Sequence, residues 1–343
     1  MFYNGFMGLK TIISRFEPAS IKRMLKNAKL VSKESGKNEL LVLIDMANCI
    51  LKYNIGYMEY HLFHFVDKNK EDRLTYVNYN HSQKLFSMLN DYSYNDVFKN
   101  KLIFNERFKD LIGRDFLDAA HVEYEEFEKF CKGKKKIFAK PKDSCSGQGI
   151  YKGFDLEKED LKKLHEFLKE NDLFVEDLIV QNETMSTLNP TSINTVRVCT
   201  VLDDKDEAHV MYCILRMGIE GMSVDNVGSG GIYTLLSAEG KIENPCWSDK
   251  TLTTYTKHPS SGMELKGFAV PYFKEALEIC KKAAKVEKHI RYVGWDIAIG
   301  KNGPLIVEGN DLPGYDMPQN YYVSGKDVGL LPEFERIVGK INI

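Results

Sequence analysis

Hydrophobic residues within positions 1–95 recur mainly at the spacing of a helix. Leu85, Met88, Leu89 and Tyr92 are an example, because residues three and four positions apart lie on one face of a helix. The run 40–44 could form a buried strand, and a buried helix explains it equally well. We therefore predict a mostly helical N-terminal region over residues 1–98.

Beyond residue 100 the pattern changes to apolar strands separated by a few amphipathic helices. Helices are predicted over 155–170 and 271–288, where apolar residues such as Leu161, Leu164 and Leu168 share one face. Strands are predicted over 136–140, 193–201, 208–216, 291–299 and 304–308, and a strand or buried hinge over 173–180. This order favours an α+β fold over a parallel Rossmann sheet.

The most informative segment is a predicted β-hairpin over residues 293–310. Turn-forming residues at 300–304 separate two apolar runs, which favours antiparallel pairing of the runs. Folding about Asn302 gives the facing pairs Ile299–Leu305, Ile297–Val307 and Asp296–Glu308. Side chains alternate between the faces of a strand, so Asn310 shares the face of Glu308.

This hairpin brings candidate magnesium ligands together. Directly opposed side chains have Cβ atoms about 5 Å apart, so Asp296 and Glu308 repel each other unless a cation lies between them. Two carboxylates and the amide of Asn310 offer the oxygen ligands that Mg²⁺ takes together with phosphate and water. The alternative is a hairpin whose polar face simply meets water.

A glycine-bearing loop follows the predicted strand at 136–140, which ends near Lys140. Glycines let backbone N–H groups approach an anion closely, so this loop is a candidate phosphate site beside the lysine. It is neither a Walker loop nor a dinucleotide fingerprint, and a plain β-turn is the alternative. The loop residues considered are Ser144, Ser146, Gly147, Gln148 and Gly149.

Composition narrows the class of protein without naming its chemistry. Of the 343 residues 43% are hydrophobic and 28% charged, which is typical of a globular chain. The formal net charge of −2 gives no indication of a nucleic-acid partner. Seven cysteines without a C-x-x-C pair favour reduced thiols, and so a cytoplasmic location.

The sequence gives no signal for membrane insertion or secretion. The apolar runs are too short to span a bilayer, so no transmembrane segment is expected. Residues 1–16 are interrupted by Asn4, Lys10 and Arg15 and lack the continuous apolar core of a secretory signal. This stretch could be an amphipathic helix that touches a membrane or a partner, and a helix that packs on the protein itself is the favoured interpretation.

Taken in order, these residues resemble the ATP-grasp superfamily over positions 100 to 320. The resemblance rests on Lys101, Phe138-Ala139-Lys140-Pro141, the S-x-G-Q-G loop, Val175-Glu176, Glu183, Trp295-Asp296 and Glu308-Gly309-Asn310. The helical N-terminus and the segment 192–198 are similar to the branch called sugar-transfer associated ATP-grasp. The resemblance implies two α+β lobes that grip ATP, a central lobe at 99–185 and a C-terminal lobe at 186–343.

The same resemblance implies roles for individual residues. Lys101 and Lys140 would hold the ATP phosphates, and the loop from Ser144 to Gly149 would close over them. Glu183 would bind the ribose hydroxyls, and magnesium would be held by the hairpin residues Asp296, Glu308 and Asn310. The backbone that would line the adenine slot belongs to Glu176, Asp177, Leu178 and Ile179.

Two arginines and Lys140 are the catalytic candidates. Arg197 alternates with Val196 and Val198, so its guanidinium leaves the core face of the strand and could bind a phosphate. A surface salt bridge is the alternative. Arg216 precedes a second glycine-rich loop at 228–231 that could lie near the transferred phosphoryl group, or could be an ordinary β-loop.

The activity implied is an ADP-forming carboxylate–amine ligase that uses ATP and Mg²⁺ and an acyl-phosphate intermediate. Expected partners are small-molecule carboxylates and amines, with sugar-linked substrates implied by the polysaccharide-associated branch. A sugar or polyol kinase on the same scaffold and a non-catalytic ATP-binding component of a glycan assembly complex are the alternatives. Residues 1–95 lack the βαβ pattern of many ATP-grasp ligases, so the sequence does not specify the acceptor, and it leaves the oligomeric state open.

Overall fold

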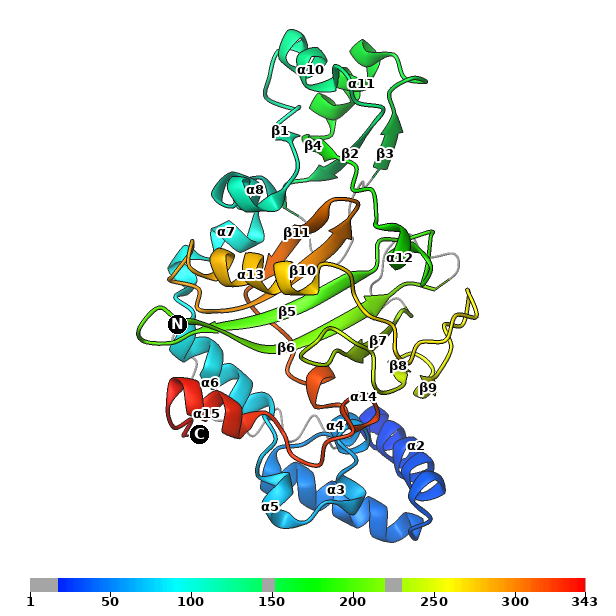
Figure 1. The fold of residues 1–343 in the computed structure, drawn as a ribbon. Coiled ribbons are helices and arrows are strands. Elements are labelled where there is room, and N and C mark those ends of the chain that lie inside the picture. Colours follow the sequence, from blue (N-terminus) through cyan, green and yellow to red (C-terminus); the bar gives the residue numbers. More distant parts are fainter. Residues whose placement is uncertain (1–17, 144–151, 220–229, 343) are drawn as a thin grey trace.

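Three bodies stack along the long axis of the molecule, with a seven-stranded sheet at the centre (Figure 1). A small lobe with a four-stranded sheet lies at the top, and helices from the N-terminal part lie at the bottom. The computed structural model describes residues 18–143, 152–219 and 230–342. The expectation for residues 1–16 falls outside these ranges. None of the described helices is both long and apolar enough to cross a bilayer.

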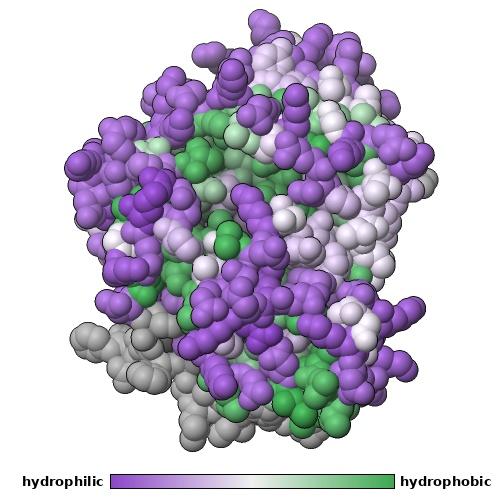
Figure 2. Space-filling view, turned by 60° about the horizontal axis from the view of Figure 1, so that its bottom comes forward, coloured by the Kyte–Doolittle hydropathy of each residue, from purple (hydrophilic) through white to green (hydrophobic). Residues whose placement is uncertain are grey.

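The N-terminal part is helical, as predicted. Asn38 caps the helix over the run 40–44 by accepting a hydrogen bond from the amide of Leu40, so this run is a helix and not a strand. The helical lobe, as we call residues 18–89, comprises α2 (Pro18–Ser35), α3 (Glu39–Tyr53), α4 (Tyr57–Leu62), η1 (Phe65–Asp67), α5 (Lys70–Arg73) and α6 (Tyr79–Leu89). Figure 2 turns the molecule so that this end comes forward.

The small lobe is an antiparallel sheet covered by two helices. The sheet has the order β1-β4-β2-β3. The predicted helix at 155–170 begins only at residue 161, because Asp160 caps its first turn and Asp155 still belongs to strand β3. The elements are β1 (Phe116–Leu117), α10 (Tyr124–Cys131), β2 (Lys136–Pro141), β3 (Lys152–Asp155), α11 (Leu161–Glu170) and β4 (Leu173–Asp177).

The central sheet is antiparallel throughout, in the order β11-β10-β5-β6-β7-β8-β9. Strands β5 and β10 are buried along their whole length, and the bounds of β5, β6, β10 and β11 were predicted to within two residues. The strands are β5 (Thr195–Leu202), β6 (Ala208–Met217), β7 (Ile232–Leu235), β8 (Cys246–Ser248), β9 (Thr253–Tyr255), β10 (Tyr292–Gly300) and β11 (Gly303–Asn310).

The two faces of this sheet are covered by different parts of the chain. On one face α13 (Phe273–Ala284) buries Phe273, Ala276 and Cys280 against the core that holds Trp295. The other face packs against the helical lobe together with the C-terminal helices. These are η4 (Met317–Gln319), α14 (Tyr321–Ser324) and α15 (Leu331–Val338).

Short helices before the small lobe pack on the outer strand β11. Phe104 and Phe108 of this segment share one core with Trp295 of the central sheet. Residues 99–112, which the sequence division placed with the central lobe, therefore pack on the C-terminal one. The helices are η2 (Tyr92–Tyr94), α7 (Asp96–Lys99), α8 (Lys101–Arg107) and α9 (Lys109–Ile112).

Gly309 permits this close packing. A Cβ atom at Gly309 would lie 2.7 Å from Cε1 of Phe98 and 3.0 Å from Cε2 of Phe104. We expect Gly309→Ala to lower the free energy of unfolding by about 1–3 kcal/mol, because the rings must shift in a packed core. Urea unfolding measures this. Gly153→Ala, which meets no atom within 4 Å, is the control and should change little.

Candidate functional site

Asp296 lies at the centre of a buried charge cluster on the central sheet. In the strand register it faces Arg197 of β5 on one side and Glu308 of β11 on the other. Arg197 donates through Nε to Oδ1 of Asp296 and through Nη2 to Oδ2, the latter at 2.9 Å. Arg216 of β6 donates through Nη2 to Oδ2 at 2.8 Å. The sheet thus brings the predicted residues 197, 216, 296 and 308 together.

The two carboxylates of the cluster are in different electrostatic states. Burial acts to raise the pKa of Asp296, but the charges of Arg197 and Arg216 outweigh it and bring the pKa to about 2. Burial and the negative charge of Asp296 raise the pKa of Glu308. The two arginines therefore outweigh the burial of Asp296, whereas their charges only partly offset the burial of Glu308 and its repulsion by Asp296.

The hairpin register was predicted correctly on one side of a bulge and wrongly on the other. The pair Asp296–Glu308 is as expected, but Ile297 faces Ile306 and Ile299 faces Pro304. The turn contains two residues between Gly300 and Gly303, and Val307 is the extra residue of the bulge. Ile306, not Val307, is consequently buried in the core.

Asn310 extends the same face of β11. It lies opposite Gly294, and its amide donates to the Gly294 carbonyl at 3.4 Å. A Cβ atom at Gly294 would lie 2.9 Å from Cδ of Arg197, so this glycine leaves room for the arginine side chain to reach Asp296. That Asn310 serves as a metal ligand stays a prediction.

Lys140 anchors a second buried cluster in the small lobe. Its Nζ lies 2.7 Å from Oε1 of Glu176, on the neighbouring strand β4. Burial acts to raise the pKa of Glu176, but the charges of Lys140 and Arg114 outweigh it and lower the pKa. The Glu176 side chain therefore points to the lysine, and only the backbone of this residue remains to line a nucleotide slot.

Arg114 joins this cluster to the central sheet, and sequence reasoning missed it. Its Nε lies 3.0 Å from Oε2 of Glu176, and its Nη2 donates to the carbonyl of Val307 at 3.2 Å. Arg114 thus contacts the bulge directly beside Glu308. Nothing near Arg114 in the sequence distinguishes it from a surface arginine, because Glu176 and Val307 are 62 and 193 residues away.

Lys101 lies at the start of α8, next to the strand that carries Lys140. Its backbone amide donates to the carbonyl of Lys142 at 2.8 Å, two residues beyond Lys140. The two lysine-bearing segments therefore lie side by side. The predicted phosphate loop, Ser144 to Gly149, lies outside the described residues, as do residues 228 and 229 of the second glycine-rich loop at 228–231.

The predicted adenine slot falls on the segment that leads from β4 to the central sheet. Asp177 pairs with Lys134 at 2.7 Å, while Leu178 is exposed and Ile179 is half-buried. The amide of Lys301 donates to the carbonyl of Val180 at 3.1 Å, so the segment runs along the turn of the hairpin.

Glu183 and Gln181 lie at the end of this segment and differ in their surroundings. Glu183 begins the short helix α12 (Glu183–Ser186), and its side chain is exposed. Gln181, which sequence reasoning did not single out, accepts a hydrogen bond from the amide of Asn194 at 2.6 Å and donates to the carbonyl of Asn189. It therefore fixes the approach to strand β5.

Comparison with protein families decides the identity. A family model described as sugar-transfer associated ATP-grasp matches residues 80–330, which is more than half of the chain. The chain belongs to this family. The resemblance seen in the sequence and the predicted α+β, ATP-grasp fold are therefore confirmed. A comparison with curated proteins found no match.

Several solved structures are similar to this chain at low identity. The ATP-grasp ligase PsnB, complexed with minimal precursor, Mg and ADP, is 15% identical, with a TM-score of 0.42 over 73% of this chain and 60% of that one. The ADP complex of purK, an N5-carboxyaminoimidazole ribonucleotide synthetase, is 8% identical, with a TM-score of 0.42 over 72% and 52%. An L-amino acid ligase from Bacillus licheniformis is 12% identical, with a TM-score of 0.39 over 72% and 51%.

The donor set on the hairpin of this ATP-grasp protein fits a divalent cation that prefers oxygen. Within the described ranges no group of three His, Cys, Asp or Glu side chains gathers. The hairpin instead offers two carboxylates and an amide, which is a set that Mg²⁺ completes with phosphate oxygens and water. The raised pKa of Glu308 agrees with this fit, because burial and Asp296 disfavour its negative charge and a bound cation would offset both.

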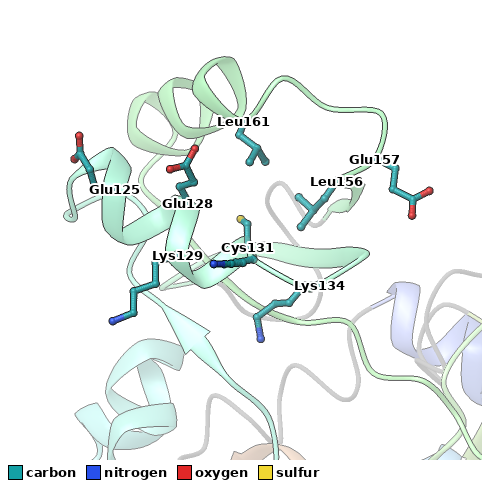
Figure 3. A pocket seen from close by; sticks show the side chains of 9 residues that line it. Glu125, Glu128, Lys129, Cys131, Lys134, Leu156, Glu157 and Leu161 are labelled. Atoms are coloured by element: carbon teal, nitrogen blue, oxygen red, sulfur yellow. The ribbon is translucent and has the colours of Figure 1, made fainter.

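A surface pocket of about 610 Å³ lies elsewhere in this ATP-grasp protein, on the small lobe beside α10 and α11 (Figure 3). None of its lining residues is a predicted site residue. The pocket is open and mixes charges of both signs. Its lining consists of Glu125, Glu128, Lys129, Cys131, Lys132, Lys134, Leu156, Glu157 and Leu161.

Proposed function

We propose that this ATP-grasp protein is an ATP- and Mg²⁺-dependent carboxylate–amine ligase that forms ADP and an acyl-phosphate intermediate. The observation that carries the proposal is the buried group of Arg197, Arg216, Asp296 and Glu308 on the central sheet. It combines oxygen donors for a cation with guanidinium groups for a phosphoryl group, which is what phosphoryl transfer requires.

The position of Lys140 supports a nucleotide held between the two sheets. Burial lowers the pKa of Lys140, while the carboxylates of Glu176 and Glu308 act in the opposite direction. Glu308 on the central sheet is thus close enough for its charge to act on a lysine of the small lobe. A triphosphate bound here would meet Lys140 from one lobe and the hairpin residues from the other.

In the proposed reaction a substrate carboxylate oxygen attacks the γ-phosphorus of ATP, and ADP leaves. An amine then attacks the acyl carbon, loses a proton and expels phosphate, which leaves an amide. Mg²⁺ held by Asp296, Glu308 and Asn310 would neutralise phosphate charge. Arg197 and Arg216 would bind the equatorial oxygens of the transferred group, since guanidinium groups match phosphate geometry. Their hydrogen bonds to Asp296 fix where they point.

Lys140→Ala should weaken ATP binding by at least about tenfold, because a buried charge–phosphate contact is worth more than about 1.4 kcal/mol. The fold should persist, since Arg114 still pairs with Glu176. Isothermal titration with ATP and Mg²⁺ measures the affinity. Lys136→Ala, on the same strand but exposed, is the control. Equal ATP affinity in the two variants would contradict the role of Lys140.

Product analysis distinguishes ligase from kinase. With a mixture of amino acids or uronic acids as acceptors, phosphate release that requires both a carboxylate and an amine supports the ligase. A stable phosphorylated sugar or polyol would instead establish a kinase. If the protein binds ATP but turns over no mixture of acceptors, it is a non-catalytic ATP-binding protein.

A sugar-linked acceptor is the substrate class that we propose, because the matching family is described as associated with sugar transfer. Uronic acids supply a carboxylate, and amino sugars supply an amine. ATP-dependent phosphate release should therefore be greater with these sugars than with free amino acids at the same concentration. A preference for amino acids would contradict this choice of substrate.

A further inference from the structure

Helix α2 carries a row of lysines on its outer side. Lys22, Lys26, Lys29 and Lys33 are all exposed, and they recur at three- and four-residue spacing. Among the described residues, none of the four side chains makes a hydrogen bond or ion pair. The side of α2 that they form is therefore positively charged without internal compensation.

Helix α3, which packs beside α2, carries an exposed aliphatic stripe. Leu40, Ile44 and Leu51 recur at helical spacing, and Leu41 adjoins them. Their exposed fractions are 64%, 51%, 65% and 64%, respectively, which is unusual for aliphatic side chains on one helix. Figure 2 shows apolar side chains gathered toward the lower edge of this end of the molecule, beside strongly hydrophilic ones.

The two rows lie on the outer sides of two helices that contact each other. The opposite sides of α2 and α3 bury Met24, Val31, Val42 and Met46 in the same core cluster. The remaining sides of both helices therefore face away from this core cluster. We call the eight residues Lys22, Lys26, Lys29, Lys33, Leu40, Leu41, Ile44 and Leu51 the α2–α3 face.

Charge is distributed unevenly between this hairpin and the rest of the chain. Residues 18–53 hold seven basic and three acidic side chains, whereas the whole chain has a net charge of −2. Asp45 pairs with Arg73 at 2.6 Å, and Glu34 accepts from Tyr322 at 2.6 Å, so both are engaged within the fold. The positive excess is thus concentrated on the outer side of the hairpin.

We propose that the α2–α3 face docks on an anionic lipid surface. Aliphatic side chains that enter the acyl boundary and lysines at the level of the phosphates are the two features that such binding uses. Lysine stems also reach along apolar surface while their ammonium groups stay in water. A second copy of the chain would bring the same positive surface against itself, which opposes self-association through this face.

The position of the α2–α3 face would allow the protein to catalyse its reaction while it is bound to a membrane. Figure 1 shows α2 and α3 at the end of the molecule opposite the small lobe, with the central sheet between them. Docking through the helical lobe would leave Lys140 and Glu308 accessible to substrates. Variants of the face should therefore alter lipid binding without altering turnover of soluble substrates.

Vesicle sedimentation tests the proposal with the whole 343-residue chain. Wild-type protein should co-sediment with phosphatidylcholine vesicles that contain phosphatidylglycerol and should bind pure phosphatidylcholine vesicles at least about tenfold more weakly. Raising the salt concentration should weaken binding to the anionic vesicles, because salt screens exposed charges. Equal binding to the two kinds of vesicle, or no binding to either, would overturn the proposal.

Two sets of variants locate the binding surface. The triple change Lys22→Gln, Lys26→Gln and Lys29→Gln should weaken binding at least about thirtyfold. Matched changes at Lys162, Lys163 and Lys169, which are exposed on α11 of the small lobe, should leave it unaltered. Equal affinities of the two triple variants would show that lipid binds elsewhere and would refute the proposal.

The aliphatic stripe is tested separately. Ile44→Ser combined with Leu51→Ser should also weaken vesicle binding at least about tenfold, through loss of apolar contact. The thermal melting temperature checks that the fold is intact, which is expected because both side chains are exposed. Sedimentation equilibrium tests the alternative. If wild-type protein dimerises, the two changes abolish the dimer and wild type binds no vesicles, the stripe is an interface between copies and lipid docking is refuted.

Discussion

Glu308→Gln should reduce Mg²⁺-dependent turnover at least about 100-fold while leaving stability nearly unchanged. A lost metal ligand removes several kcal/mol of transition-state stabilisation, and about 2.7 kcal/mol already corresponds to 100-fold. Stability should hold because burial and Asp296 raise the pKa of Glu308, which makes its charged carboxylate less favourable relative to the neutral carboxyl. Glutamine has the shape and the neutral charge of that form.

Steady-state phosphate release across a range of Mg²⁺ concentrations measures this effect, and urea unfolding measures stability. Glu243→Gln, an exposed glutamate outside the cluster, is the matched control and should behave as wild type. Full turnover in Glu308→Gln at low Mg²⁺ would show that this carboxylate does not hold the metal.

Asp296→Asn should abolish turnover and also destabilise the protein by about 3–5 kcal/mol, because it removes the carboxylate charge that pairs with buried Arg197 and half-buried Arg216. The hairpin sequence alone gives the same expectation for both carboxylates, namely loss of activity in an intact fold. The structure changes that expectation for Asp296, since its two oxygens accept hydrogen bonds from Arg197 and Arg216.

A double variant separates the two effects of losing Asp296. Adding Arg216→Met to Asp296→Asn removes one of the two positive charges that Asp296 pairs with and should restore part of the lost stability without restoring activity. The urea midpoint of each variant is the measurement. An Asp296→Asn protein that unfolds at the same urea concentration as wild type would contradict the structural role of this ion-pair group.

Local sequence signals were enough to predict the core of the candidate site. Turn chemistry at 300–304 predicted the hairpin and placed Asp296 opposite Glu308, as the structure has it. The pairs nearer the turn were wrong, because the turn is tighter by one residue and Val307 bulges out to compensate. A bulge shifts the register by one residue, and the alternation of apolar residues in the sequence does not reveal it.

Contacts between distant strands could not be predicted. Arg197 was expected to leave the core face of its strand and to bind a phosphate or form a surface salt bridge. Arg197 is buried and pairs with Asp296, which lies 99 residues further along the chain, so the surface salt bridge was wrong and the phosphate contact stays a prediction. Arg114 was missed for the same reason, because its role depends on how two separate sheets come together.

The helical lobe shows that hydrophobic residues in a predicted helix need not be buried. The run 40–44 was expected to lie in a core, as a strand or as a helix. Val42 is buried, but Leu40, Leu41 and Ile44 are exposed on the outer side of α3. Periodicity identifies the helix and cannot tell which apolar side chains meet the core and which remain outside.

The core that the helical lobe shares with the central sheet limits where the chain can be truncated without unfolding it. The family match begins at residue 80, yet Met46, Tyr60 and Phe65 lie in one cluster with Tyr212, Trp247 and Tyr292 of the sheet. A fragment that starts at residue 80 would present those sheet aromatics to solvent. Expression of such a fragment should give an aggregating product, since its boundary divides a single folding unit.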